Sequence, residues 1–247
     1  MNEYEINKIK KLESFYWWHI ARRELAISLI KKYLPKDITL TILDLGCGTG
    51  EFLGELSSFG QLNGIDISPC AVKLCQERGL KHVYQEDIVN LQFSPELFDL
   101  VTALDIFEHI EDDKKAFSES RRVLKKKGTL LLTVPANSCL WSHHDIALSH
   151  KRRYALSELK RKLVLSGFKI ERISYCIFFL FLPIFLFRMV QKIYFEVSLF
   201  PPKTVYLIFP KFINTVFLWL CELENLLIKI GVNFPFGVSI VCVATKN

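Results

Sequence analysis

The stretch Leu43-Asp44-Leu45-Gly46-Cys47-Gly48-Thr49-Gly50 decides the fold of this chain of 247 residues. An apolar run that begins at Ile38 leads into it, and Glu51-Phe52-Leu53 then begins a helical pattern. A buried strand, a glycine-rich turn and the start of a helix, in that order, are typical of a pocket for a nucleotide-like ligand. Glycines let the ligand lie against the backbone and let the chain turn at positive φ, and the free N–H groups of the helix start can contact the ligand.

Acidic residues around this turn narrow the kind of ligand. A loop that binds pyrophosphate has the spacing G-x-G-x-x-G, whereas this loop reads G-x-G-x-G with Asp44 before it and Glu51 after it. Carboxylates at these places would repel a pyrophosphate and attract a cationic ligand. Two later strand ends are also acidic, in Asn63-Gly64-Ile65-Asp66-Ile67-Ser68 and in Gln85-Glu86-Asp87-Ile88. The carboxylate of Asp66 can accept hydrogen bonds from ribose hydroxyls.

Together the three segments resemble the ordered motifs of the class I S-adenosylmethionine-dependent methyltransferases. Residues 43–50 are similar to the first motif of that family, 64–68 to its second motif, and 86–88 to its adenine-contacting segment. An ordered set is far more specific than a lone glycine motif, so we favour this resemblance over a bare Rossmann-like loop. The resemblance implies S-adenosylmethionine as the cofactor, bound by Asp44, Gly46, Cys47, Gly48, Gly50, Asp66, Ile67, Asp87, Ile88 and Leu104.

The rest of the chain continues the alternation of apolar strands and helices, which predicts a parallel, doubly wound sheet. In the resembled family the seventh strand runs antiparallel between the fifth and the sixth, and we expect the same of the last apolar run, 237–244. The predicted fold class is therefore α/β. It is a Rossmann-like, seven-stranded, mostly parallel sheet with a hydrophobic, mainly helical insertion between strands six and seven.

Four parts are expected along the chain. They are an N-terminal helical lid at 1–35, a cofactor-binding core at 36–175, the insertion at 176–236 and the last core strand at 237–247. The aromatic cluster of the N-terminal part can pack on the core as an ordinary helix contact. Alternatively, this part closes over the cofactor pocket and places Arg22 or Arg23 near the methionine carboxylate.

The insertion is rich in aromatic residues, with twelve of the twenty phenylalanines of the chain. Its uncharged run, 173–187, would extend only about 22 Å as a helix, which is short of the ~30 Å hydrocarbon core of a bilayer. Residues 211–230 predict a helix with a wide apolar face. Such a helix can pack in a core, close a dimer or lie in a bilayer interface. We favour the interface, with peripheral contact and no membrane span.

The composition narrows the setting and the partners. Half of the residues are hydrophobic and the net charge is +6, which suits an anionic membrane surface or nucleic acid. No nucleic-acid recognition module is visible, so we expect no nucleic-acid partner. Seven cysteines without a C-x-x-C pair disfavour a zinc ribbon or a disulfide framework. Because residues 1–20 do not resemble a signal peptide, we expect a cytoplasmic protein, peripheral on the membrane face.

The loop after the fourth strand, 104–112, faces the methyl group in the resembled fold. It lacks the [DNS]-P-P-[YFW] signature with which amine-directed enzymes of this fold hold a planar nitrogen, so oxygen or carbon acceptors are favoured. Asp105, Glu108 and His109 permit two interpretations. They bind a divalent ion, as a similar segment does in ubiquinone-biosynthesis O-methyltransferases. Otherwise the carboxylates contact the cofactor or cap a helix, and His109 is a general base. We favour the second interpretation and predict no metal ligands.

A second polar cluster follows the fifth strand, in Trp141-Ser142-His143-His144-Asp145 and His150-Lys151-Arg152-Arg153-Tyr154. It is expected at the carboxyl edge of the sheet, where ligands bind in open α/β folds. The pattern H-D-x4-H-x-R-R-Y resembles a subgroup of these methyltransferases that accompanies glycan and lipid biosynthesis. An Asp beside a His can fix the tautomer of the ring, so the candidates for proton transfer are His144, Asp145 and His150, together with His109.

The basic end of this cluster suits an anionic acceptor, because arginines bind phosphate groups well. The expected acceptor contacts are Arg152, Arg153, Tyr154 and Trp141. A solvated basic turn before a helix is the alternative interpretation.

These features predict a methyltransferase that methylates an oxygen atom of an amphipathic or lipid-linked acceptor, such as a glycan or isoprenoid lipid. The apolar insertion would hold the tail, and the basic cluster would hold an anionic head. Two alternatives stay open. One is a soluble methyltransferase for a small molecule such as a quinone precursor, with the insertion as a lid. The other is a non-catalytic membrane scaffold with the same fold.

Overall fold

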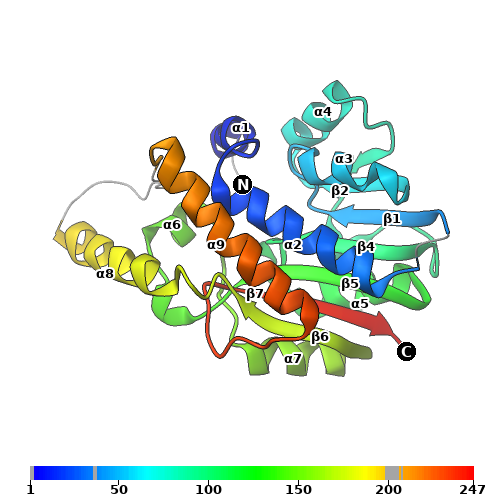
Figure 1. The fold of residues 1–247 in the computed structure, drawn as a ribbon. Helices are drawn as coiled ribbons and strands as arrows, with labels where there is room; N and C mark the ends of the chain where they lie inside the picture. Colours follow the sequence, from blue (N-terminus) through cyan, green and yellow to red (C-terminus); the bar gives the residue numbers. More distant parts are fainter. Residues whose placement is uncertain (1–2, 36–37, 198–205, 207) are drawn as a thin grey trace.

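Seven strands form one sheet in the order β3-β2-β1-β4-β5-β7-β6, as seen in the computed structural model of the chain (Figure 1). The structure describes residues 3–35, 38–197, 206 and 208–247. Neighbouring strands are parallel except that β7 runs antiparallel to both β5 and β6. The predicted α/β sheet with one reversed strand is thus confirmed. The strands are β1 (Leu40–Leu45), β2 (Gly60–Asp66), β3 (Val83–Gln85), β4 (Phe98–Leu104), β5 (Leu124–Pro135), β6 (Phe168–Cys176) and β7 (Ser239–Lys246).

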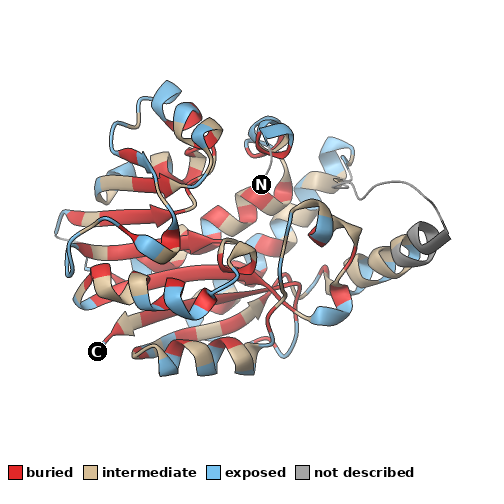
Figure 2. Ribbon diagram, turned by 180° about the vertical axis from the view of Figure 1, so that it is seen from behind, coloured by how far each residue is buried: buried red, intermediate tan, exposed pale blue. Residues whose placement is uncertain are grey.

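Helices cover both faces of the sheet, which is why the central strands are apolar on both sides. On one face, α2 (Trp17–Tyr33) and α9 (Lys211–Ile230) pack over side chains such as Ile42 and Val241. On the other face, α5 (Asp113–Val123) and α7 (Leu156–Leu165) pack over Leu43 and Cys242. Successive residues of a strand point to opposite faces, so each central strand contributes to both cores. Figure 2 shows these strands as a continuous buried layer.

The remaining helices lie near the carboxyl ends of the strands and along the edge formed by β2 and β3. The short helix α3 (Glu51–Glu55) follows β1, and α4 (Pro69–Glu77) follows β2, beginning after Ser68, whose side chain accepts a hydrogen bond from the Ala71 N–H. The N-terminal part, predicted to be helical, forms α1 (Glu3–Leu12) and α2, with a turn between them. After β5, the helix α6 (His143–Ala147) occupies the predicted second polar cluster.

The insertion supplies α8 (Phe181–Val197) and α9, and buried polar contacts join α9 to the start of the insertion and to α2. The Glu224 carboxylate accepts hydrogen bonds from the backbone N–H groups of Ile177, Phe178 and Phe179. Asn225 donates to the Ala21 carbonyl of α2 at 3.0 Å. Parts of the predicted insertion, 198–205 and 207, and the predicted boundary at 36 lie outside the described residues.

The face of α9 that points away from α2 is apolar. Six exposed side chains repeat at intervals of four and three residues and form one narrow stripe, since i, i+4 and i+7 lie on the same side of a helix. They are Phe212, Val216, Trp219, Leu223, Leu226 and Ile230. None of the helices in the described part of the chain combines the length and apolar character that crossing a bilayer requires.

Candidate active site

The glycine turn after β1 has the backbone that its sequence predicts. Gly46, Gly48 and Gly50 have φ angles of 65°, 57° and 81°, a region that favours glycine. The Gly48 N–H donates to Asp66 Oδ2 at 3.0 Å, so the acid at the end of β2 supports the turn. A Cβ atom on Gly46 would lie 2.1 Å from Cδ1 of Ile106, which shows how closely the loop after β4 approaches this turn.

A cavity of about 310 Å³ begins at this turn and lies at the carboxyl ends of β1, β4 and β5. One wall consists of Asp44, residues 46–49 and residues 104–106. The opposite walls come from the aromatic start of α2, from α8 and from the polar cluster after β5. The predicted cofactor side and the predicted acceptor side therefore belong to one continuous cavity.

Only some of the predicted cofactor contacts line this cavity. Asp44, Gly46, Cys47, Gly48 and Leu104 do so. The others lie around it. Gly50 begins α3, Asp66 also accepts from the Ser68 N–H at 2.8 Å, and Asp87 caps the 3-10 helix Ile88–Asn90, whose Ile88 is buried. Ile67 is 65% exposed and is free to contact a ligand beyond the cavity.

Asp44 is a buried carboxyl on the cofactor side. Its side chain is 3% exposed, and its Oδ1 accepts a hydrogen bond from the Thr102 hydroxyl at 2.6 Å. Burial raises the pKa of Asp44 to about 7, although the Thr102 hydrogen bond and the charge of Arg22 oppose this change. A carboxyl in this state gains its charge easily when a cation lies beside it.

The N-terminal segment lies over the glycine turn and is held there by ion pairs. Arg22 Nη1 lies 2.5 Å from Asp105 Oδ2, and Thr133 donates to Asp105 Oδ1 at 2.8 Å. Arg23 pairs with Glu55 at 2.8 Å. Glu13 accepts a hydrogen bond from the Thr49 hydroxyl of the turn itself. Both predicted arginines line the cavity, but each is already engaged by a carboxylate.

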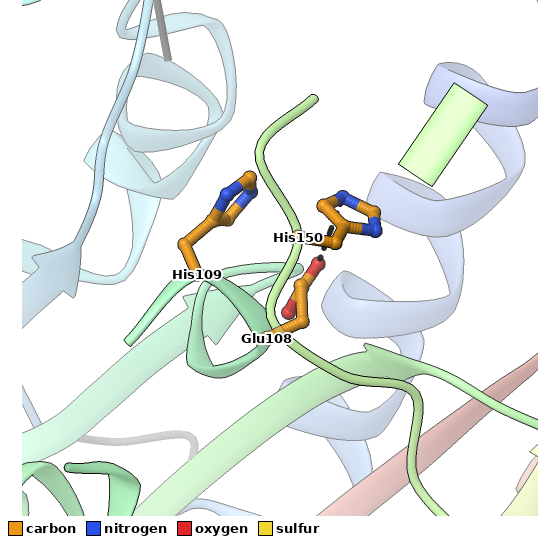
Figure 3. A group of neighbouring side chains, drawn as sticks. All are labelled: Glu108, His109 and His150. Carbon is orange, nitrogen blue, oxygen red and sulfur yellow. Dashed lines mark ion pairs between the residues drawn. The ribbon is translucent and has the colours of Figure 1, made fainter. Parts of the chain in front are cut away.

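The acid-rich loop after β4 brings together a possible set of metal ligands that differs from the one named by sequence. Asp105 is occupied by Arg22 and Thr133, whereas Glu108 is fully buried and both of its oxygens lack hydrogen-bond partners. Ligand atoms of Glu108, His109 and His150 lie within 4.8 Å of one another (Figure 3). Burial raises the pKa of Glu108 well above its ordinary value, and the charge of Asp105 adds to this effect.

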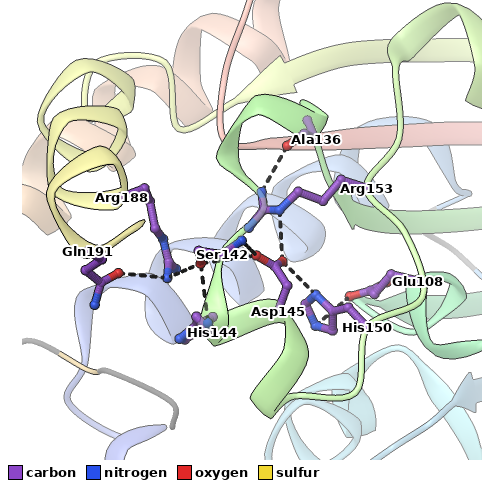
Figure 4. A network of polar contacts seen from close by, with 9 residues as sticks. All are labelled: Glu108, Ala136, Ser142, His144, Asp145, His150, Arg153, Arg188 and Gln191. Carbon is purple, nitrogen blue, oxygen red and sulfur yellow. Dashed lines mark hydrogen bonds and ion pairs between the residues drawn. The ribbon is translucent and has the colours of Figure 1, made fainter. Parts of the chain in front are cut away.

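The polar cluster after β5 is organised by Asp145, which is fully buried (Figure 4). Its Oδ1 lies 3.0 Å from His150 Nδ1 and accepts from Arg153 Nε at 2.8 Å. Its Oδ2 accepts a hydrogen bond from the Ser142 N–H at 2.9 Å, and this bond is part of the capping box at the start of α6. Burial alone would raise the pKa of Asp145, but His150 and Arg153 hold it below its ordinary value.

An ionised Asp145 decides the tautomer of His150. A carboxylate only accepts hydrogen bonds, so the proton of the ring is on Nδ1 and Nε2 is left to accept a proton. His150 lines the cavity, and its Nε2 lies 3.9 Å from Glu108 Oε1. This is the arrangement of a histidine that is oriented for general-base chemistry.

The other two predicted histidines also line the cavity, but burial keeps them in the neutral form. Burial lowers the pKa of His109 to about 4, and the neighbouring His150 contributes to this change. Burial and the charge of Arg188 lower the pKa of His144 well below its ordinary value. The Nδ1 atom of His144 has no hydrogen-bond partner among the described residues.

Three of the four residues predicted to contact the acceptor do not line the cavity. Tyr154 is fully buried in the core, with its hydroxyl 2.7 Å from Asp113 Oδ2, because its backbone pairs with Ala136 beside β5. Arg152 turns to Asp113 and to the Glu111 carbonyl. Neither these residues nor Trp141, which ends a 3-10 turn, line the cavity. Of the four, Arg153 alone lines it.

Arg188 of α8 also lines the cavity, and sequence reasoning missed it. Its Nη1 donates to Ser142 Oγ at 2.9 Å and lies 3.3 Å from Gln191 Oε1 (Figure 4). The available signal was a charged residue at the end of the long uncharged run 173–187.

Comparison with known proteins finds a methyltransferase domain in this chain. Residues 43–132 match a family model described as a methyltransferase domain. A tRNA (carboxymethyluridine(34)-5-O)-methyltransferase of Arabidopsis thaliana is 38% identical over 96 residues, which are 38% of this chain and 23% of that protein. A ubiquinone biosynthesis O-methyltransferase of Coxiella burnetii is 28% identical over 130 residues, which are 47% of this chain and 56% of that protein. The chain thus spans about a quarter to a half of the length of these relatives.

Solved structures share the fold across nearly the whole chain. One is in the complex between the Haloferax volcanii Trm112 methyltransferase activator and its methyltransferase partner. It has a TM-score of 0.63 and 16% identity, and the match covers 99% of this chain and 95% of that one. Another is phosphoethanolamine N-methyltransferase 2 of Haemonchus contortus in complex with S-adenosyl-L-methionine. It has a TM-score of 0.59 and 22% identity over 90% of this chain and 52% of that one.

Proposed function

We propose that this chain, which has the class I fold of the S-adenosylmethionine-dependent methyltransferases, methylates an oxygen atom of an amphipathic or lipid-linked acceptor. Its methyltransferase domain lies at 43–132, and S-adenosylmethionine is the cofactor. The observation that carries the proposal is the single cavity that joins the glycine turn to the Asp145–His150 pair. Two curated relatives are named as O-methyltransferases, which supports oxygen as the methylated atom.

In this proposal the residues of the cavity orient the acceptor and remove its proton. The sulfonium of S-adenosylmethionine leaves as a neutral thioether, so the protein needs chiefly to align the acceptor oxygen and to deprotonate a hydroxyl. His150 Nε2 accepts that proton while Asp145 stabilises the resulting imidazolium. Neutral His144 and His109 are candidate hydrogen-bond partners of the acceptor.

The amphipathic character of the proposed acceptor rests on the opposite wall of the cavity. Aromatic and aliphatic side chains of α8, among them Pro183, Ile184 and Phe187, face the same space as the histidines. The exposed stripe of α9 supports contact with a membrane surface, where such an acceptor would be taken up. We propose peripheral binding at the cytoplasmic face and no nucleic-acid partner.

The function is tested with His150→Gln and the matched control His82→Gln. The control changes an exposed histidine that directly precedes β3. Both variants should bind S-adenosylhomocysteine like the unaltered protein in calorimetry. With labelled S-adenosylmethionine and a membrane lipid extract, His150→Gln should lose at least ~100-fold in methyl incorporation, and the control should not. Methyl incorporation into tRNA but not into lipid would contradict the proposed acceptor. If the unaltered protein does not bind S-adenosylhomocysteine, the proposal that the chain is a methyltransferase is contradicted.

Membrane contact is tested with vesicles that contain phosphatidylglycerol. Leu223 and Leu226 belong to the exposed stripe of α9, whereas Leu165 is a 78% exposed leucine of α7. Leu226→Ser should weaken co-sedimentation with the vesicles by about tenfold, because burying one leucine side chain contributes about 1.5–3 kcal/mol. Leu165→Ser should not. Unchanged sedimentation of Leu223→Ser/Leu226→Ser, or a change only in oligomeric state, would refute membrane contact.

A second candidate function is a soluble methyltransferase of a small aromatic acceptor, assisted by a divalent ion. The unpartnered Glu108 carboxyl beside His109 and His150 favours it, and so does the ubiquinone-biosynthesis relative. Glu108, His109 and His150 would hold the ion, which would lower the pKa of an acceptor hydroxyl. Methylation of a catechol that stops with EDTA and returns with Mg²⁺, and that Glu108→Gln abolishes, would support this alternative over the lipid-linked acceptor.

A further inference from the structure

Arg188 brings a positive charge into the acceptor side of the cavity without a carboxylate to balance it. Its guanidinium contacts the neutral groups Ser142 Oγ and Gln191 Oε1. Among the residues that the structure describes, no acidic oxygen lies within 4.0 Å of it. Arg188 points from α8 toward Ser142 of the polar cluster after β5 (Figure 4).

The other arginines that line the cavity are already paired with carboxylates. Arg22 pairs with Asp105, and Arg153 pairs with Asp145, whose remaining bonds go to His150 and Ser142. Burial favours the uncharged form of Glu108, so this carboxyl does not supply the missing anion. One positive charge at the acceptor end is therefore left without a partner.

This charge persists at neutral pH. Burial and the neighbouring Arg153 lower the pKa of Arg188 to about 10, and Asp145 and two tyrosines oppose the change. An arginine with this pKa is protonated at pH 7. Removing a guanidinium from water is costly unless it is paired, and the cost rises further when an apolar ligand displaces the remaining water. An anionic group on that ligand would offset the cost, since a guanidinium forms two parallel hydrogen bonds with phosphate or carboxylate.

We infer that Arg188 anchors an anionic group of the acceptor, a phosphate or a carboxylate, whose apolar part lies along the same helix. Ile184 and Phe187 line the cavity beside Arg188 on α8, so one helix offers both an anion contact and an apolar wall. The inference rests on the proposed methyl transfer and names the acceptor class as an amphiphilic anion. It also moves the anion contact from the basic cluster after β5, where Arg152 lies outside the cavity, to the insertion.

The test uses the full chain saturated with S-adenosylhomocysteine and four probes in calorimetry. Octyl phosphate and nonanoate carry an anion and a tail, 1-octanol carries the tail alone, and inorganic phosphate carries the anion alone. Octyl phosphate, below its micellar concentration, should bind at least ten times more tightly than 1-octanol or inorganic phosphate. Equal binding of octyl phosphate and 1-octanol would overturn the inference. Equal binding of octyl phosphate and inorganic phosphate would show a site for a small free anion and overturn the amphiphile.

The variants separate Arg188 from the rest of the cavity. Arg188→Gln should lower the affinity for octyl phosphate at least tenfold and leave the affinity for 1-octanol unchanged. Arg188→Lys should keep part of the preference, because it keeps the charge but not the planar fork. The matched control Arg161→Gln changes an exposed arginine of α7 and should behave like the unaltered protein. An unchanged affinity of Arg188→Gln for octyl phosphate would overturn the inference.

The failure of this inference is distinguishable from the failure of methyl transfer. Binding of S-adenosylhomocysteine is measured first on every protein. If the unaltered protein does not bind it, the proposed function fails. If it binds normally and octyl phosphate shows no preference, only the anionic acceptor fails. Should Arg188→Gln not fold, the comparison of the probes on the unaltered protein and on Arg188→Lys decides the matter.

Discussion

Replacing Asp44 by asparagine should change how the stability of the protein depends on pH. The pKa of Asp44 is about 7 in the folded protein, whereas 3.8 is the ordinary value of an aspartate. The folded protein therefore holds a proton that the unfolded chain releases above pH 4. The stabilisation from this proton is complete below pH 3.8 and is lost as the pH rises to about 7. At about 1.36 kcal/mol for each pH unit, the loss amounts to about 4 kcal/mol.

The Asp44→Asn variant keeps the shape of the side chain and its contact with Thr102 but carries no titrating group. Its free energy of unfolding in urea, without ligand, should rise relative to that of the unaltered protein between pH 5 and pH 7, by up to about 1.4 kcal/mol per pH unit. Above pH 7 the difference should level off. Glu222→Gln, which likewise changes a carboxylate to an amide but at an exposed position of α9, controls for the chemical substitution.

A difference in unfolding free energy that stays constant from pH 5 to pH 8 would refute this reasoning. Ligand binding provides a second readout with the opposite sign. An ionised Asp44 attracts the sulfonium, so the ratio of the affinities for S-adenosylmethionine and S-adenosylhomocysteine should increase as the pH rises through 7. In Asp44→Asn this ratio should not depend on pH.

Three further substitutions, one of them with a matched control, have expected outcomes. Tyr154→Phe removes a buried hydroxyl that bonds Asp113, so thermal unfolding should show a loss of about 1–2 kcal/mol with unchanged binding of S-adenosylhomocysteine. Glu224→Gln replaces the carboxylate that accepts three backbone N–H groups and should cost about 2–3 kcal/mol in urea unfolding. The exposed Glu222→Gln should cost less than about 0.5 kcal/mol. Asp145→Asn should lower the rate of methyl transfer at least ~100-fold at unchanged cofactor affinity, and an unaltered rate would exclude His150 as the base.

Local patterns in the sequence were sufficient for individual helices and strands, whereas the antiparallel pairing of the last strand was expected from the family resemblance. The glycine spacing at 46–50 requires positive φ angles, and the structure has them at each glycine of the turn. The helix expected at 211–230 has these bounds in the structure, because a proline precedes it and Gly231 ends it with a left-handed backbone. The periodicity of a strand or a helix depends on residues that are only a few positions apart, so a short segment of sequence contains the information that specifies it.

The acceptor side of the site depended on contacts between distant segments. Within Arg152-Arg153-Tyr154, the first and third side chains both contact Asp113, whereas Arg153 lines the cavity. Successive residues of an extended backbone, here bridged to Ala136, point to opposite sides. Charge balance is equally non-local, since Asp105 is neutralised by Arg22 from 83 positions away. Residue patterns along the chain therefore specify the strands and the glycine turn, and the ordered motifs point to the cofactor. Which cation lacks a partner depends on the fold, because a guanidinium is free or engaged according to the carboxylates that folding brings beside it.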